Sequence, residues 1–142
     1  MRPLPVTFIG YYQVLRGIVS GLFGLSILLF AGLAAKLASL AAEGNALQRF
    51  ISFSGHIAGL VILVAAVFHI VAGWGVLGMQ NWGRLLTILF SAFGLAILLP
   101  FLHGLLPIVF AAINAATILY LVRPATKQAF RGQDDKLTRM AA

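Results

Sequence analysis

Charged residues divide the chain into long apolar runs, and the length of each run indicates whether it can cross a membrane. Residues 17–35 contain no charge, and the apolar pattern extends back to Val6 across the single charge of Arg16. A helix needs about 20 apolar residues to cross the hydrocarbon core of a bilayer. We therefore expect a first spanning helix over residues 6–35.

The second apolar run is bounded on both sides by polar or turn-forming residues. Residues 36–49 include Lys36, Glu43 and Arg49, which is typical of a polar connection, and we expect helical extensions at both of its ends. The dense apolar part covers residues 56–77, and the segment that follows, Gly-Met-Gln-Asn-Trp-Gly, has the composition of a turn. These limits predict a second spanning helix over residues 56–77.

The third run is too long for one helix and contains two helix breakers. Residues 85–122 carry no Lys, Arg, Asp or Glu, and Pro100 and Pro107 stand on either side of Gly104. Proline lacks the backbone N–H that a helix interior requires. We expect a tight hairpin between a third span over residues 85–101 and a fourth over 105–122, followed by a basic tail over 123–142.

Composition supports a membrane location and excludes several classes of function. The chain is 61% hydrophobic and 9% charged, whereas soluble domains average about one quarter charged residues. It has no cysteine, which excludes disulfides, thiol nucleophiles and iron–sulfur ligation. None of the three acidic residues lies in an expected span, which argues against a carboxylate-coupled exporter or a di-metal enzyme. The fold expected is an all-α integral membrane four-helix bundle without catalytic residues or a metal site.

Positive charge is distributed unevenly between the two sides of such a bundle. Arg2, Arg16, Arg84 and five residues of the tail share one side, whereas Lys36 and Arg49 lie on the other. Lys and Arg accumulate in cytoplasmic loops. The sequence therefore predicts both termini in the cytoplasm of a bacterial inner membrane. The net charge of +7 is explained by this orientation and by lipid contact, so no nucleic-acid partner is expected.

Small residues recur at spacings that place them on one face of a helix. Such spacing lets two helices approach closely in a membrane. Two interpretations stay open, packing within the bundle and docking against another membrane protein. The residues concerned are Gly10, Gly17, Gly21, Gly24, Gly55, Gly59, Ala111 and Ala115.

Three polar residues are candidates for a cofactor site within the bundle. At 1.5 Å per residue His69 and Asn114 fall within about one helical turn of the same depth, with Ser91 at a similar level. A neutral imidazole suits axial ligation of a haem or chlorophyll-type macrocycle. The alternative is a histidine satisfied by a single interhelical hydrogen bond.

Basic residues near the ends of the expected spans are candidates for lipid head-group contacts. Long basic side chains reach from a helix end to the membrane surface. A tail held against anionic lipid and a merely solvated tail are both compatible with the sequence. The expected head-group residues are Arg16, Arg84, Arg123, Lys127 and Arg131.

The second half of the chain carries a pattern seen in other small membrane proteins. Its elements are Gly73-Trp-Gly-Val-Leu77, Trp82-Gly-Arg84, Pro100, Asn114 and Tyr120-Leu121. Over residues 70–122, together with the step Arg16-Gly17, the chain resembles small bacterial four-helix integral membrane proteins of unknown function. The resemblance implies an aromatic, arginine-bearing turn between spans two and three and a proline that ends span three. It implies a fold and no mechanism.

These observations lead to one expected function and two alternatives. The leading hypothesis is a non-catalytic accessory subunit that packs its glycine and alanine faces against a larger membrane complex, for example an energy-transducing one. The first alternative is a cofactor-binding or lipid-binding membrane module centred on His69, with Asn114 and Ser91 beside it. The second is a small transporter or channel. In each case the expected partners are lipids and other membrane proteins.

Overall fold

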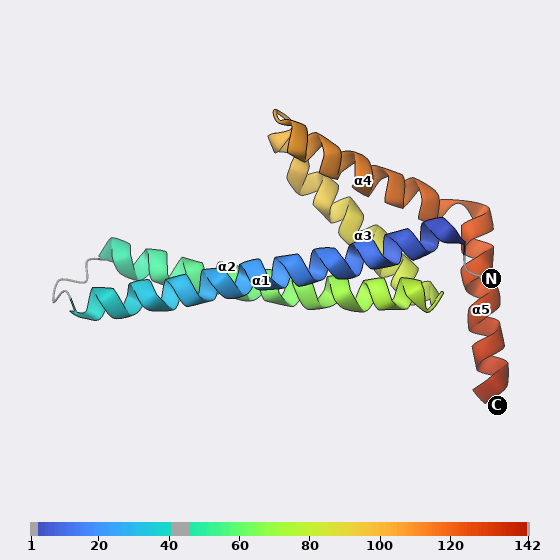
Figure 1. The fold of residues 1–142 in the computed structure, drawn as a ribbon, viewed down its shortest axis with the longest axis horizontal. Coiled ribbons are helices and arrows are strands. Elements are labelled where there is room, and N and C mark those ends of the chain that lie inside the picture. Colours follow the sequence, from blue (N-terminus) through green and yellow to red (C-terminus); the bar gives the residue numbers. More distant parts are fainter. Residues whose placement is uncertain (1–2, 41–45, 142) are drawn as a thin grey trace. The chain divides into compact units, whose positions relative to one another are not determined.

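The computed structural model describes residues 3–40 and 46–141, which are almost entirely helical (Figure 1). No strand occurs in these two ranges, so the expected all-α class is confirmed. A short 3-10 turn over Leu99–Phe101 separates the third and fourth of five α-helices. The helices are α1 (Leu4–Leu40), α2 (Ala46–Leu77), α3 (Asn81–Leu98), α4 (Leu105–Val122) and α5 (Pro124–Ala141).

Four helices in the described ranges are long and apolar enough to cross a membrane. Their apolar parts match the expected spans in number and approximate position, whereas the side of the membrane on which each terminus lies stays a prediction. The four candidate spans are Leu4–Leu37, Arg49–Leu77, Asn81–Leu98 and Leu105–Val122.

The first two helices are longer than the apolar runs that predicted them. α2 begins at Ala46, ten residues before the expected start at residue 56, and the added residues include the apolar Phe50, Ile51 and Phe53. α1 has 37 residues, which at 1.5 Å per residue is about 55 Å. The hydrocarbon core is only about 30 Å thick, so α1 must tilt or extend beyond it.

The hairpin between α3 and α4 forms where the two prolines predict it. α3 ends at Leu98, three residues before the expected limit, and Pro100 falls in the 3-10 turn. Gly104 then adopts an extended conformation, with φ −130° and ψ 157°, and precedes the first turn of α4. Pro107 lies in that first turn, where the missing N–H has no intrahelical partner to lose.

The turn between α2 and α3 is a Schellman motif in which the left-handed residue is not glycine. The Gln80 N–H donates to Gly75 O at 2.9 Å, and the Met79 N–H donates to Val76 O at 3.0 Å. Met79 has φ 57°, a conformation that costs a residue with a Cβ about 1–2 kcal/mol. Its side chain packs against the hydrophobic core, which offsets that cost.

Contacts divide the chain into two compact units, and the division crosses α1 and α2. The α1–α2 unit comprises Leu15–Ile70, and the α3–α5 unit comprises Met1–Val14 together with Val71–Ala142. The positions of these units relative to one another are not determined. α5, which lies within the expected tail over residues 123–142, belongs to the same compact unit as α3 and α4.

The α1–α2 unit is an antiparallel helix pair with small residues at its contacts. A Cβ added at Gly17 would lie 2.8 Å from Ala66 O, and one added at Gly24 would lie 3.1 Å from Gly59 O. A step of seven residues along α1 therefore corresponds to a step of seven residues backwards along α2. This is the repeat of a coiled coil, in which side chains of one helix fit between those of the other.

The α3–α5 unit continues the same spacing and adds a second close approach. A Cβ added at Gly10 would lie 3.2 Å from Gly73 O, one repeat before the contact of Gly17. Where α2 and α3 meet, a Cβ added at Gly75 would lie 2.7 Å from the Cα of Gly83. Glycine at these positions lets the helix backbones touch.

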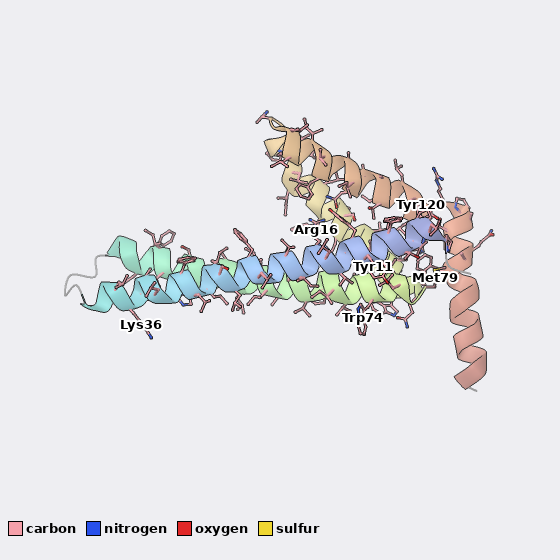
Figure 2. The ribbon with its side chains drawn as sticks, viewed as in Figure 1. Tyr11, Arg16, Lys36, Trp74, Met79 and Tyr120 are labelled. Atoms are coloured by element: carbon pink, nitrogen blue, oxygen red, sulfur yellow. The ribbon has the colours of Figure 1, made fainter. Side chains whose placement is uncertain are left out.

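One aromatic side chain anchors α5 to the rest of its unit. Phe130 is fully buried and clusters with one apolar side chain each from α1, α2 and α4, namely Val6, Val76 and Leu121. Figure 2 shows Met79, which also packs against this cluster, close to α5. The first two turns of the expected basic tail are thus a packed helix.

Replacing glycine with alanine, which adds one methyl group, distinguishes glycines packed against another helix from glycines with free space around them. Gly17→Ala should destabilise the chain by about 1–3 kcal/mol, because the new Cβ overlaps the backbone of α2. Gly32→Ala is the matched control on the same helix, since nothing lies within 4 Å of its Cβ position, and it should be neutral or stabilising. SDS-induced unfolding followed by far-UV circular dichroism measures both. Equal stability of the two variants would contradict the packing described above.

Candidate functional site

The inward face of α3 is polar, which is unusual for a helix able to span a membrane. Its buried residues are Gly83, Arg84, Thr87, Ser91 and Gly94, all on one side of the helix. α4 packs against α3 and contributes its own buried residues, Asn114, Thr117 and Leu121. Polar residues within membrane helices are costly and mark either interhelical bonding or function. This polar interior is the candidate functional site of the α3–α5 unit.

Arg84 joins the beginning of α3 to the end of α4. Its side chain is 6% exposed. The guanidinium donates from Nη1 to Leu121 O at 3.1 Å and from Nε to Asn81 Oδ1 at 3.0 Å. Leu121 O belongs to the last turn of α4, where carbonyl oxygens lack an intrahelical donor. A cation at this position also interacts favourably with the negative end of the helix dipole.

This bond sets the register between the two helices, and it brings two expected site residues to one level. Ser91 lies seven residues after Arg84, and Asn114 lies seven residues before Leu121 on the antiparallel helix. Because both helices rise equally per residue, Ser91 and Asn114 lie at about the same height. Their side chains are 1% exposed, so both point into the interior of the unit.

Some polar groups in this interior have no hydrogen-bond partner among the described residues. The Asn114 amide donates to Phe110 O at 2.9 Å within α4. The hydroxyls of Thr87 and Ser91 lack a partner in residues 3–40 and 46–141, as do both polar atoms of Gln13. Leaving such a group buried and unpaired costs about 1–3 kcal/mol.

Gln13 was missed by sequence reasoning, although its position gives a signal. It is fully buried in the α3–α5 unit, three residues after Gly10 and four before Gly17. The spacing of three and four places it on the contact stripe of α1 between two glycines. A polar residue between two glycines of this stripe is the sequence signal that indicates a buried position.

His69 belongs to the α1–α2 unit, so its proximity to Ser91 and Asn114 stays a prediction. The imidazole is 9% exposed, and its Nδ1 lies 2.7 Å from Ala65 O, one turn earlier in α2. Since a carbonyl oxygen only accepts hydrogen bonds, the proton of a neutral ring is on Nδ1. Arg16 is half-buried in the same unit.

Most of the small residues expected to mediate packing contact another helix of the same unit. A Cβ added at Gly55 would lie 3.0 Å from the Ala31 Cβ, and one added at Gly59 would lie 2.7 Å from the Leu28 side chain. Gly21 is looser, with the Ala66 Cβ at 3.6 Å. On α4, Ala111 and Ala115 are half-buried, so part of the surface of each is open.

The expected head-group residues differ in exposure, and head-group contact stays a prediction for all of them. Arg84 is buried by the contacts described above, whereas Arg123, Lys127 and Arg131 are exposed. The Arg123 guanidinium lies over the ring of Tyr120, 5.9 Å from its centroid, in a cation–π contact. Figure 2 shows Arg16 part-way along α1 and Tyr120 where α4 meets α5.

In the part of the chain that the structure describes, no group of three or more His, Cys, Asp or Glu residues is arranged to hold a metal ion. His56 and His103 lie in different units and are both exposed. Comparisons of the chain with protein-family models, with curated proteins and with solved structures found no match. The resemblance to small four-helix membrane proteins therefore stays a prediction.

Replacing Arg84 with methionine tests whether this side chain holds the α3–α5 unit together. Methionine keeps the length of the side chain and removes both hydrogen bonds, and each bond to a charged group contributes about 1.5–3 kcal/mol. The only two tryptophans, Trp74 and Trp82, lie in this unit and report its unfolding by fluorescence. Arg84→Met should unfold at clearly lower SDS than the wild type.

Arg123→Met is the control for this measurement, because Arg123 is an exposed arginine of the same unit that contacts the ring of Tyr120 on its own side of the helix junction. It should unfold close to the wild type. If the two variants lose stability equally, the effect reflects loss of a positive charge and not loss of the contact with α4.

Proposed function

We propose that the chain is a non-catalytic accessory subunit of a larger membrane complex, in a bacterial inner membrane and with both termini in the cytoplasm. One observation carries this proposal. Three buried polar side chains are the best candidates for a chemical role, and all three bind backbone carbonyl oxygens of this same chain. They are Arg84, Asn114 and His69. Arg84 bonds to the end of a neighbouring helix, and His69 and Asn114 bond within their own helices, so all three make structural contacts. A catalytic group would instead be held within reach of a substrate.

The structure also narrows the surface available to a partner. Gly10, Gly17 and Gly24 contact α2, so the glycine stripe of α1 is used within the chain. Small residues that keep part of their surface open remain on α4, at Ala111 and Ala115. Their spacing of four residues is the one that lets a second helix approach closely. We therefore place the partner helix on this flank of α4.

Native mass spectrometry of the tagged protein, extracted in a mild detergent from its own membranes, tests the proposal. We expect a species heavier than 15.2 kDa by a defined protein mass. Ala115→Leu should remove that mass, because leucine separates the two helices. Ala58→Leu, at an exposed alanine of α2, should retain it. A wild-type chain that is found only alone or with copies of itself would overturn the subunit role.

A second candidate function rests on the geometry of His69. With the Nδ1 proton held by Ala65 O, the lone pair of the ring is on Nε2, the atom that would bind the iron or magnesium of a macrocycle. A backbone carbonyl that fixes the ring in this way is the usual support for a histidine ligand. The bound macrocycle would supply electron-transfer or light-absorbing chemistry.

Visible absorption of the purified protein distinguishes this candidate from a structural histidine. If His69 holds a macrocycle, His69→Ala should abolish an absorption band that the wild type carries. His56→Ala is the matched control, because the His56 Nδ1 makes the same 2.7 Å contact with a carbonyl oxygen, that of Ser52, on an exposed surface. A colourless wild type, or a band unchanged in His69→Ala, would exclude the cofactor role.

A further inference from the structure

A groove lies between the first residues of α1 and the second half of α4, within the α3–α5 unit. Figure 1 shows these two segments beside one another. The groove has a volume of about 680 Å³, which is in the range of small-molecule sites, about 300–1,000 Å³. Leu4 and Phe8 form one wall, and Ile113 and Ala116 form the other. The lining is therefore hydrocarbon along most of its length.

One end of the groove is polar and positively charged. Tyr120 and Arg123 line this end, and Arg123 follows directly after the candidate span that closes at Val122. The span of α1 opens at Leu4, another lining residue. The charged end of the groove therefore lies where two spans meet the membrane surface.

The charge at this end has no neighbouring acid in the sequence to neutralise it. Residues 123–132 contain three basic residues and no Asp or Glu. The start of α1 carries the positive end of the helix dipole, and its first turn holds no acidic residue. An anion at the mouth of the groove is favoured by both contributions.

We propose that this groove binds one acyl chain of an anionic phospholipid, with the head-group phosphate on Arg123. An apolar groove that opens within the hydrocarbon layer is filled by lipid chains, and the cation at its surface end selects the head group. The cation–π contact with Tyr120 holds the Arg123 guanidinium at the mouth, where a phosphate can accept its N–H groups. The proposal requires only a membrane location, so it stands or fails separately from the subunit role.

Lipid binding to the full chain in mild detergent tests this proposal. Native mass spectrometry would compare the retention of phosphatidylglycerol, which is anionic, with that of phosphatidylcholine, which is zwitterionic. The wild type should prefer phosphatidylglycerol. Arg123→Gln should reduce that preference about fivefold, the value expected for one basic residue at a membrane surface. Lys127→Gln, which removes an exposed charge that does not line the groove, should reduce it much less.

A second pair of variants tests whether the acyl chain lies in the groove. Ala116→Phe places a ring in the groove and should reduce retention of both lipids. Ala112→Phe makes the same change at an exposed alanine one turn earlier on α4, outside the groove, and should leave retention unchanged. Equal losses for Arg123→Gln and Lys127→Gln would show diffuse attraction to the tail and overturn the head-group assignment. Wild-type retention in Ala116→Phe would overturn the groove as the site.

Discussion

Close approach of helix backbones is the constraint on which both units of this structure depend. Within a bilayer, lipid tails are as apolar as leucine, so helices gain little by burying apolar side chains against one another. They associate by dispersion contact, which requires short distances. Gly17 against Ala66 in one unit, and Gly75 against Gly83 in the other, provide such distances because no Cβ intervenes. The large apolar residues, for example Phe8 and Leu22, face outward instead.

Polar contacts determine the register of the helices, which close approach alone does not determine. A stripe of small residues repeated every seven positions fits its partner equally well after a slip of seven residues, so it does not determine register. Contacts that occur once remove that ambiguity. In the α1–α2 unit the Ser52 hydroxyl donates to Ala31 O, and in the α3–α5 unit Arg84 donates to Leu121 O. Within the polar interior of the α3–α4 hairpin, Arg84 therefore has a structural role.

The sequence predicted the elements of the fold better than their contacts. Span number and the Pro100 hairpin follow from charge-free length and from proline, both of which act locally. The left-handed residue after α2 was harder, because it is Met79 and not the neighbouring Gly78, and the core that compensates it is assembled from distant segments. The contact of Arg84 likewise depends on a segment distant in the sequence. Its position at a turn suggested lipid contact, and only the register of α3 against α4 revealed a carbonyl oxygen within its reach.

Several residues of the pattern that predicts a resemblance to other small membrane proteins have internal roles in this structure, whereas Trp74 and Trp82 of the same pattern are exposed. Gly73 and Gly75 lie at helix contacts, Arg84 bonds to Leu121, and Asn114 is buried. A pattern composed of such positions specifies a fold and leaves the outer surface free to vary. The groove beside Arg123 and the alanine flank of α4 lie largely outside that pattern, on different sides of the same helix, and Tyr120 belongs to both the pattern and the groove.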